Sequence, residues 1–254
     1  MSQNRRMQVR GAVALVTGAS SGIGRATAVA LAERGATVLL HGRDRAALDD
    51  VARATGGAVL VEDLAEPGAA RRLAERAGRV DILVANAGTG FAGDFSTMDE
   101  GLPGRLVAAN LTAPIELTRQ LLPAMRDRGH GALVYVASIA GRTGVAGEAV
   151  YAATKAGLDI FAESLRLELR GTGVSVGVLV PGIVETAFFA RRGRPYGRRR
   201  PRPVTAQSAA ARTVRLVQSG RAEAYLPSWL AFPVALRAVT PSLFRRLAAR
   251  FGGS

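Results

Sequence analysis

Six short apolar runs recur along the first 180 residues and alternate with segments of helical periodicity. The apolar runs lie at 13–17, 37–40, 58–61, 80–84, 132–137 and 174–180. The helical segments between them lie at 25–34, 46–54, 69–77, about 103–128 and about 149–170. Strands that are apolar throughout, separated by amphipathic helices, are typical of a parallel sheet covered on both faces. The alternation therefore predicts an α/β fold with a doubly wound parallel sheet.

The expected sheet domain spans residues 1–226 and ends with a short edge strand near 223–227. Within it, residues of about 187–222 are expected to form a basic lid, which begins with an arginine-rich stretch and includes a helix near 205–219. Residues 227–254 are expected to form a C-terminal amphipathic extension. Its last helix would present one apolar face, made of Leu243, Phe244, Leu247 and Phe251.

The net charge of +14 is concentrated in the last quarter of the chain. Residues 187–254 carry 14 arginines and one acid, Glu223, whereas residues 1–186 carry 20 basic and 19 acidic side chains. This distribution excludes a uniformly basic protein of the histone kind. Of the 34 basic residues, the only lysine is Lys155.

Several kinds of site are excluded by composition. The chain has no cysteine, so it has no disulfide, thiolate metal site or cysteine nucleophile. Its two histidines, His41 and His130, lack the spacing of a zinc site. We expect no metal, no signal peptide in the polar N-terminal segment and no membrane-spanning helix, and therefore a cytoplasmic protein.

A glycine-rich turn joins the first strand to the first helix. It contains Gly18, Gly22 and Gly24, with Thr17, Ser20, Ser21 and Ile23 between or beside them. Such glycines allow a tight turn, close approach of a pyrophosphate to the backbone, and close helix–strand packing. The turn predicts a nucleotide-binding site of the Rossmann type.

The end of the second strand carries Gly42 and Arg43 where an acid would bind the ribose diol of NAD. A guanidinium can instead hold the 2′-phosphate of NADP through two parallel hydrogen bonds. We therefore expect NADP(H) to be favoured over NAD(H). The alternative is that Arg43 is only a solvated surface arginine.

Ser138, Tyr151 and Lys155 form the most informative constellation. Tyr151 and Lys155 are four residues apart in a helical segment, so their side chains share one face. The pKa of an unperturbed tyrosine is about 10, and a nearby ammonium is expected to lower it toward neutrality. The single lysine of an arginine-rich chain thus lies where acid–base chemistry needs it.

Over residues of about 9–186, the sequence resembles the short-chain dehydrogenase/reductase family. Besides the glycine-rich turn and the Ser-Tyr-Lys set, it shares four short motifs with the family, in the same order along the chain. These are Asp63-Leu64, Asn86-Ala87-Gly88, Asn110, and Pro181-Gly182 followed by Thr186.

The resemblance implies a role for each motif. Tyr151 would donate a proton to the substrate carbonyl, Lys155 would lower the tyrosine pKa and bind the ribose, and Ser138 would hold the carbonyl oxygen. Asn110 would maintain a water relay. Asp63 and Leu64 would contact the adenine, Asn86 to Gly88 would support the central strand beside the cofactor, and Pro181, Gly182 and Thr186 would bind the nicotinamide.

One departure from the family bears on cofactor choice. Many NADP-dependent members carry a basic residue just before the second glycine of the turn, where this chain has Ser21. NADP preference would then depend on Arg43, with Arg25 as a second contributor.

The basic lid and the tail leave alternatives open. The seven arginines of 187–205 would attract an anionic arm of the substrate, or they are simply solvated. Tail residues 227–251 would contact an anionic membrane peripherally, or pack on the domain or on a second copy. We do not expect nucleic acid, because Tyr196 is the only aromatic residue among these arginines.

The sequence therefore predicts an NADP-dependent oxidoreductase that reduces the ketone of a hydrophobic or carrier-bound, acyl- or lipid-like substrate. The resemblance also implies a homo-oligomer, either a dimer or a tetramer. One alternative is a dehydrogenase that oxidises a sterol-like or sugar-like secondary alcohol. A non-enzymatic alternative is a membrane- or nucleic-acid-binding module that retains the fold.

Overall fold

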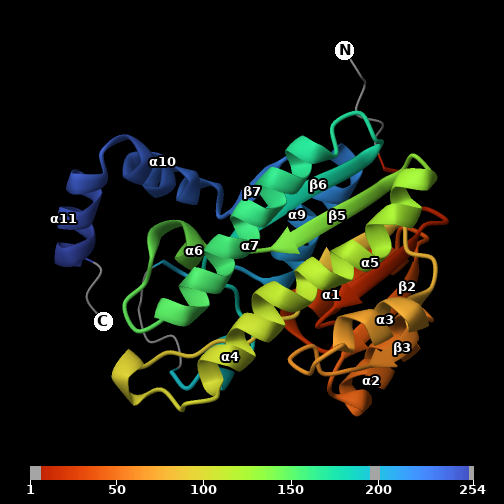
Figure 1. Cartoon of the computed structure of the whole chain (residues 1–254), viewed down its shortest axis with the longest axis horizontal. Coiled ribbons are helices and arrows are strands. Elements are labelled where there is room, and N and C mark those ends of the chain that lie inside the picture. Colours follow the sequence, from red (N-terminus) through yellow and green to blue (C-terminus); the bar gives the residue numbers. More distant parts are fainter. Residues whose placement is uncertain (1–6, 195–200, 252–254) are drawn as a thin grey trace.

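A parallel sheet forms the centre of the molecule. The computed structural model describes residues 7–194 and 201–251, and these form a seven-stranded parallel sheet in the order β3-β2-β1-β4-β5-β6-β7 (Figure 1). The strands are β1 (Val13–Thr17), β2 (Thr37–Gly42), β3 (Ala58–Val61), β4 (Ile82–Ala85), β5 (Gly131–Val136), β6 (Val174–Pro181) and β7 (Glu223–Leu226). The predicted apolar runs and the edge strand near 223–227 are confirmed.

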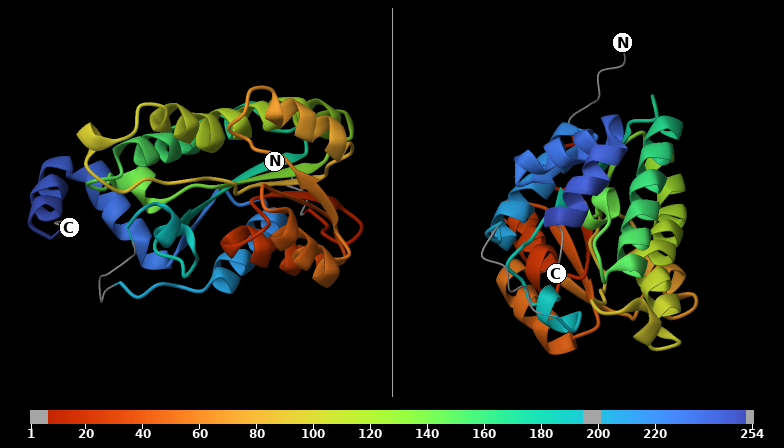
Figure 2. Two further views of the ribbon diagram at one scale, coloured as in Figure 1. Left: turned by 90° about the horizontal axis from the view of Figure 1, so that it is seen from below. Right: turned by 90° about the vertical axis from the view of Figure 1, so that its left-hand side faces the viewer.

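Helices cover both faces of the sheet, as the edge-on view of Figure 2 shows. On one face, α1 (Gly22–Ala32), α2 (Arg45–Thr55) and α9 (Ala206–Ser219) bury an apolar core against the strands. On the other, α3 (Ala69–Ala77), α5 (Ala113–Asp127) and α7 (Ala149–Glu168) bury a second core. All six residues of β5 are buried, which is why its sequence is apolar without alternation.

Local signals explain where helices begin and end. The Asp44 carboxylate accepts a hydrogen bond from the Ala47 amide at 3.0 Å and caps the start of α2. Gly56, with φ of 68°, ends the same helix in the left-handed conformation that glycine adopts most easily. α2 therefore starts just after β2 ends and packs against β2 and β3 at that side of the sheet.

The long helical segment expected at 103–128 is interrupted. It consists of α4 (Leu102–Val107), a π-helical turn (Ala108–Thr112) and α5. A π turn accommodates one extra residue per turn and often lies at a functional site. Here it contains Asn110.

The segment expected as a lid, about 187–222, has two different parts. The short helix α8 (Phe188–Arg191) lies over the carboxyl ends of the strands, next to the short helix α6 (Ile139–Thr143) and the start of α7. α9, in contrast, packs against α1 and buries residues such as Val214 and Val217 in the core. The lid expected over 187–222 is thus too wide, because 206–219 belongs to the wall of the domain. The expectations for 195–200, including Tyr196, lie outside the described residues.

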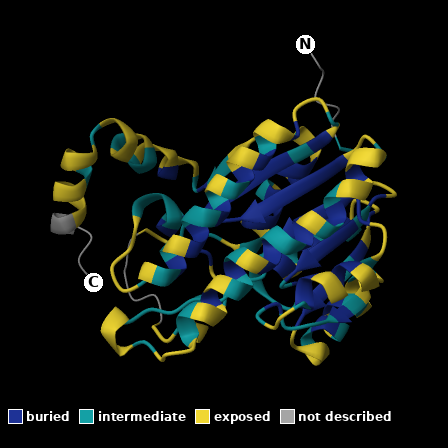
Figure 3. Cartoon of the chain, in the orientation of Figure 1, coloured by how far each residue is buried: buried dark blue, intermediate teal, exposed yellow. Residues whose placement is uncertain are grey.

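The C-terminal extension forms an arm that projects from the carboxyl end of the sheet (Figures 1 and 3). It consists of a 3-10 turn (Ser228–Leu230), α10 (Ala231–Val239) and α11 (Pro241–Phe251). α11 packs mainly against α10, and α10 packs against the 3-10 turn and α6. None of the helices in the described ranges has the length and hydropathy needed to cross a bilayer.

Candidate active site

A groove of about 610 Å³ runs along the carboxyl ends of the strands, centred where the strand order reverses between β1 and β4. This reversal point is where doubly wound sheets bind ligands. Most of the predicted site residues line it: Gly18, Ser20, Ser21, Gly22, Ile23, Arg43, Asp63, Leu64, Asn86, Ala87, Gly88, Ser138, Tyr151, Lys155, Pro181, Gly182 and Thr186. Thr17, Gly24 and Asn110, which were also predicted, are not among the lining residues.

The glycine-rich turn closes tightly because two positions need glycine. Gly18 has φ of 68°, a conformation that side chains disfavour. A Cβ on Gly24 would lie 2.2 Å from the Gly18 carbonyl oxygen, so only glycine lets α1 approach the turn. Ser21 precedes α1 but makes no capping hydrogen bond, which leaves the first amides of this helix for an anion in the groove. These features fit the pyrophosphate of a dinucleotide.

Thr17 and Asn86 hold the turn in place. The Thr17 hydroxyl accepts hydrogen bonds from the amides of Asn86, at 3.0 Å, and Ala87, at 2.9 Å. The Asn86 side chain donates to the carbonyl of Thr17 at 2.9 Å. These hydrogen bonds join the carboxyl ends of β1 and β4, where both strands border the groove.

Arg43, Asp63 and Arg105 line the groove beside the end of β2. The Arg43 side chain is 65% exposed and its guanidinium lies 3.8 Å from the Asp63 carboxylate. Arg105, which the sequence analysis did not single out, donates to Asp63 at 3.0 Å. Although burial opposes it, the Ala65 amide and these two arginines hold the pKa of Asp63 below its ordinary value. Asp63 therefore stays an ionised hydrogen-bond acceptor.

His41 lies buried at the end of β2, where its ring nitrogen Nε2 is 3.1 Å from the Glu62 carbonyl. Its Nδ1 has no hydrogen-bond partner. Burial lowers its pKa from 6.5 to about 4, because the charged imidazolium cannot be solvated there. From the sequence, His41 is only a histidine without metal partners, whereas in the structure it is part of the groove wall.

The pH dependence of stability should reveal His41. The unfolded chain, with a histidine pKa of 6.5, binds the proton before the folded chain does, so stability is lost as pH falls from 6.5 toward 4. The full effect is about 3 kcal/mol. Denaturant unfolding of the wild type and of His41→Leu across this window measures it: the wild type should lose stability relative to the variant as pH falls. A constant difference would contradict the buried, neutral histidine.

Tyr151, Ser138 and Lys155 all line the groove. Ser138 precedes α6 and its hydroxyl accepts from the Ala140 amide at 3.2 Å. Tyr151 and Lys155 are both buried on α7. The Lys155 ammonium lies 5.9 Å from the centre of the Tyr151 ring and donates to the Val136 carbonyl at 2.8 Å.

The expected lowering of the tyrosine pKa is not seen. Burial raises the pKa of Tyr151 to about 12, although a hydrogen bond with Ser138 and the charge of Arg192 oppose the rise. Burial also lowers the pKa of Lys155 to about 8. The expectation treated the pair as a cation beside a solvated phenol, whereas desolvation dominates in this dry pocket. At neutral pH Tyr151 is therefore a protonated acid, and Lys155 is still mainly an ammonium.

Asn110 acts through its neighbours. Its side-chain oxygen accepts from the Thr89 amide at 2.9 Å, and its side-chain nitrogen donates to the Thr89 carbonyl at 2.8 Å and to Thr154 at 3.2 Å. A Cβ on Gly88 would lie 3.1 Å from the Asn110 oxygen and 3.5 Å from the Lys155 nitrogen. The π turn thus places Asn110 behind Gly88 and close to Lys155.

α8 closes the groove over Tyr151. The Phe188 ring packs on the Tyr151 ring, with centroids 5.4 Å apart. Arg191 donates to the Ser21 hydroxyl of the glycine-rich turn at 3.0 Å. Arg192 forms a nearly buried ion pair with Glu148, three residues before Tyr151. Phe188 and Glu148 were not predicted as part of the site, and Arg191 and Arg192 were expected only among the lid arginines, because these contacts join segments far apart in sequence.

Two other kinds of site are not supported. Among the described residues no group of three or more acidic or histidine side chains could hold a metal ion. A wider depression of about 1150 Å³ lies between the N-terminal segment, α9 and β7, and is lined by five arginines, including Arg10 and Arg215. It contains none of the predicted catalytic side chains, so the groove is the candidate active site.

Sequence comparison agrees with this geometry. A sequence model of the family described as short chain dehydrogenase matches residues 12–196. An uncharacterized oxidoreductase of Myxococcus xanthus is 38% identical over 248 residues, 93% of this chain and 96% of the relative. The 3-oxoacyl-(acyl-carrier-protein) reductase FabG of Escherichia coli is 36% identical over 187 residues, 71% of this chain and 76% of the relative.

Solved structures show the same architecture. A short-chain dehydrogenase from Sphingobium yanoikuyae in complex with NADPH superposes with a TM-score of 0.79 at 28% identity, covering 91% of this chain and 96% of that one. A 3-ketoacyl-(acyl-carrier-protein) reductase from Brucella melitensis complexed with NADH superposes with a TM-score of 0.77 at 27% identity, covering 85% and 98%.

The sheet, its groove and the buried acid–base pair define a nucleotide-binding oxidoreductase. The chain belongs to the short-chain dehydrogenase/reductase family and is an NAD(P)-dependent enzyme of that family. The family assignment and the Rossmann-type fold predicted from the sequence are confirmed.

Proposed function

We propose that the protein reduces the ketone of a hydrophobic or carrier-bound substrate, acyl- or lipid-like, with NADPH. The observation that carries this proposal is the buried pair of Tyr151 and Lys155. A phenol with a pKa of about 12 remains protonated at neutral pH, which is the form a proton donor needs. The overall step converts a ketone, NADPH and a proton into a secondary alcohol and NADP⁺.

Each residue at the reacting end of the groove has its own part in the proposed reduction. When bound, the nicotinamide supplies the hydride. Tyr151 donates its phenolic proton to the carbonyl oxygen, and the Ser138 hydroxyl holds that oxygen by a hydrogen bond. The Lys155 ammonium stabilises the phenolate that Tyr151 becomes. Asn110 is a positioning residue for Lys155 and for a water path that returns a proton to Tyr151.

The same groove suits a dinucleotide along its length. The amides at the start of α1 and the Arg191 guanidinium would hold the pyrophosphate. Asp63 and Leu64 would flank the adenine, Lys155 would bind the nicotinamide ribose, and Gly182 and Thr186 would flank the nicotinamide. Ala87 and Gly88 would form the wall beside the central strand.

An apolar substrate is favoured by the side chains above Tyr151. Phe188 and Phe189 come from α8, and Val145 comes from the segment before α7. The Phe188 and Phe189 rings pack edge to face with centroids 5.7 Å apart. FabG of Escherichia coli, a relative by sequence, is named for a carrier-bound 3-oxoacyl substrate. An acyl chain would lie along these rings, with the ketone at Tyr151.

NADP preference is proposed on the chemistry of Arg43. β2 ends at Gly42 and Arg43 follows it, so no carboxylate at that position repels a 2′-phosphate. The Ser20 hydroxyl would lie 3.4 Å from a Cβ on Gly42 and offers a second hydrogen-bonding group to the phosphate. Arg25, exposed on α1, is a weaker candidate.

Replacing Arg43 with alanine tests the cofactor preference. Loss of a charge-assisted pair of hydrogen bonds should raise the Kd for NADPH roughly 10- to 100-fold and leave the Kd for NADH nearly unchanged. The effect should shrink at high salt. Arg45→Ala, which removes an exposed arginine outside the groove, is the matched control. Tighter binding of NADH than NADPH by the wild type would contradict the preference.

The second candidate is oxidation of a sterol-like or sugar-like secondary alcohol in the same groove. The observation that favours oxidation is the lowered pKa of Lys155, about 8, because the Lys155 ammonium then gives up its proton at mildly alkaline pH. A homo-oligomer, dimer or tetramer, is part of the proposal in either case. Two values of kcat/KM distinguish the directions: one for long-chain ketones and 3-oxoacyl thioesters with NADPH, and one for secondary alcohols with NADP⁺.

A further inference from the structure

The C-terminal arm, residues 228–251, exposes an unusual amount of apolar surface. On α10, Phe232 is 72% exposed and Val239 is 79% exposed, and the two lie seven residues apart on one face. On α11, Leu243 and Leu247 lie one turn apart and are 46% and 38% exposed. Figure 3 shows both helices largely exposed, in contrast to the buried sheet. Side chains of this size exposed in one continuous element indicate a surface that is covered in use.

The charge of the arm indicates what kind of surface covers its exposed apolar side chains. From Ala224 to the end of the chain there is no acidic residue, and the arm carries four arginines, at positions 237, 245, 246 and 250. Arg245 and Arg246 are exposed on the same helix as Leu243 and Leu247, off the face that these leucines form. Apolar and aromatic side chains bordered by arginine are typical of helices that lie in the interface of an anionic bilayer. A second copy of this basic arm would instead bring like charges together.

The arm begins at the end of the sheet where the groove opens. It follows the carboxyl end of β7, and the groove opens along the carboxyl ends of the strands. Leu230 at its base lies against Gly182, where an added Cβ would be 2.9 Å from the Leu230 Cδ1 atom. Other exposed apolar side chains of this end are Phe95, at 63%, and Val145, at 41%.

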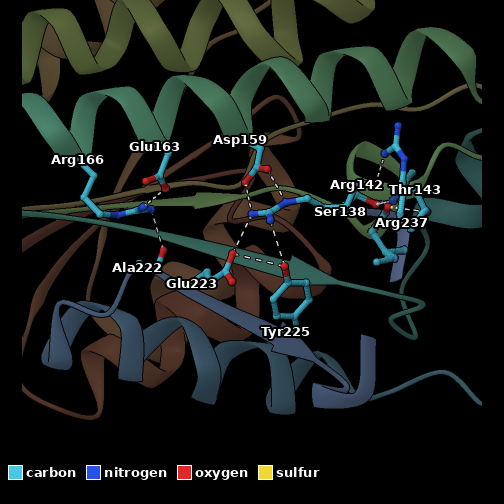
Figure 4. Close-up of polar contacts among 12 residues, drawn as sticks. Ser138, Arg142, Thr143, Asp159, Glu163, Arg166, Ala222, Glu223, Tyr225 and Arg237 are labelled. Atoms are coloured by element: carbon cyan, nitrogen blue, oxygen red, sulfur yellow. Dashed lines mark hydrogen bonds and ion pairs between the residues drawn. The ribbon is translucent and has the colours of Figure 1, made fainter. Parts of the chain in front are cut away.

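A polar network fixes the direction of the arm (Figure 4). Arg142, at the end of α6, donates to Asp159 of α7 at 2.6 Å, to Glu223 of β7 at 3.0 Å and to Tyr225 at 3.1 Å. Arg237 of α10 donates to the backbone carbonyl of Arg142. α6, which Ser138 precedes, is thus joined directly to the arm through the contact of Arg142 with Arg237.

We propose that the arm docks the protein on an anionic lipid surface with the mouth of the active-site groove facing the bilayer. Trp229, Phe232, Val239, Leu243 and Leu247 enter the interface, and Arg245 and Arg246 contact lipid phosphates. Docking does not depend on the activity proposed above. Its consequence does rest on that activity: a long-chain ketone would pass from the lipid to Tyr151 without crossing bulk water.

Sedimentation with phospholipid vesicles tests the docking of the full-length protein. The protein should bind vesicles of phosphatidylcholine mixed with phosphatidylglycerol and should bind pure phosphatidylcholine at least roughly tenfold more weakly. The double variants Leu243→Gln/Leu247→Gln and Arg245→Gln/Arg246→Gln should each lose roughly tenfold or more in affinity. Tyr151→Phe should bind as the wild type does, which separates docking from catalysis.

Matched controls lie elsewhere on the surface. Ile160→Gln removes a side chain that is 66% exposed on α7, and Arg126→Gln/Arg170→Gln removes two exposed arginines that precede the amino ends of β5 and β6. Neither should change vesicle affinity by more than about twofold, since neither touches the arm. Thermal unfolding of each variant checks that it folds.

Fluorescence gives an independent readout, because Trp229 is the only tryptophan and is 54% exposed. Its emission should shift to shorter wavelength with anionic vesicles and stay unchanged with neutral ones. Equal binding of the wild type and the arm variants, or no binding to anionic vesicles, would overturn the proposal. Loss of a dimer in the arm variants, with vesicle affinity unchanged, would overturn it too and assign the arm to a second copy.

Discussion

Tyr151→Phe is expected to lower kcat for ketone reduction by roughly 10²- to 10⁴-fold, the usual contribution of a positioned proton donor. The substitution removes one oxygen from a buried ring that packs on Phe188 and leaves the ring itself in place. The KM for NADPH should change little, because the groove keeps its shape. Steady-state kinetics with a long-chain ketone measures the loss, and NADPH binding by the variant shows that the groove is intact.

Tyr135→Phe is the matched control. Tyr135 is a buried tyrosine on β5 whose hydroxyl hydrogen-bonds Thr118 at 2.7 Å, away from the groove. Its loss should lower stability by about 1 kcal/mol and leave kcat near the wild-type value. A Tyr151→Phe enzyme with full activity would exclude Tyr151 as the proton donor.

Lys155→Met is expected to lower kcat/KM by roughly 100-fold. At 5.9 Å from the Tyr151 ring centre, the ammonium stabilises a phenolate by about 3 kcal/mol at an effective dielectric constant of 20. The pH profile should change as well. With a lysine pKa of about 8, the wild-type reduction rate should fall as pH rises above that value, because Lys155 loses its proton.

Lys155→Arg keeps the positive charge of the side chain and changes its shape, so it shows which of the two the reaction needs. A guanidinium stays protonated through this pH range, so whatever activity remains should lack the decline above pH 8. Its planar shape fits poorly in the space between Val136 and Gly88, so the rate should still be well below that of the wild type. Unchanged kcat/KM and an unchanged pH profile in Lys155→Met would show that the lysine plays no part in the reaction.

The strands and the core of the site were predictable from the sequence because their causes are local. Uninterrupted apolar runs mark strands buried on both faces, and the glycines at 18 and 24 are required by backbone conformation and close contact. The four-residue spacing of Tyr151 and Lys155 follows from one turn of a helix. Each of these signals lies within a few neighbouring residues.

Other features depend on contacts between distant segments and could not be predicted. The π turn at Asn110 adds one residue to a helix, which an amphipathic pattern over 103–128 does not reveal. The pKa of Tyr151 depends on how completely the pocket excludes water, so the expected lowering was wrong in sign. The ion pair of Arg192 with Glu148 joins residues 44 positions apart.

Hydride transfer from NADPH deuterated at its transferable hydrogen tests the central claim most directly. The enzyme, supplied with this cofactor and a panel of long-chain ketones and 3-oxoacyl thioesters, should form a secondary alcohol that carries deuterium on the carbinol carbon. Mass spectrometry of the product reads the label, and Tyr151→Phe should form almost none of it. Absence of labelled alcohol from every ketone, together with turnover of a secondary alcohol by NAD⁺, would contradict the account.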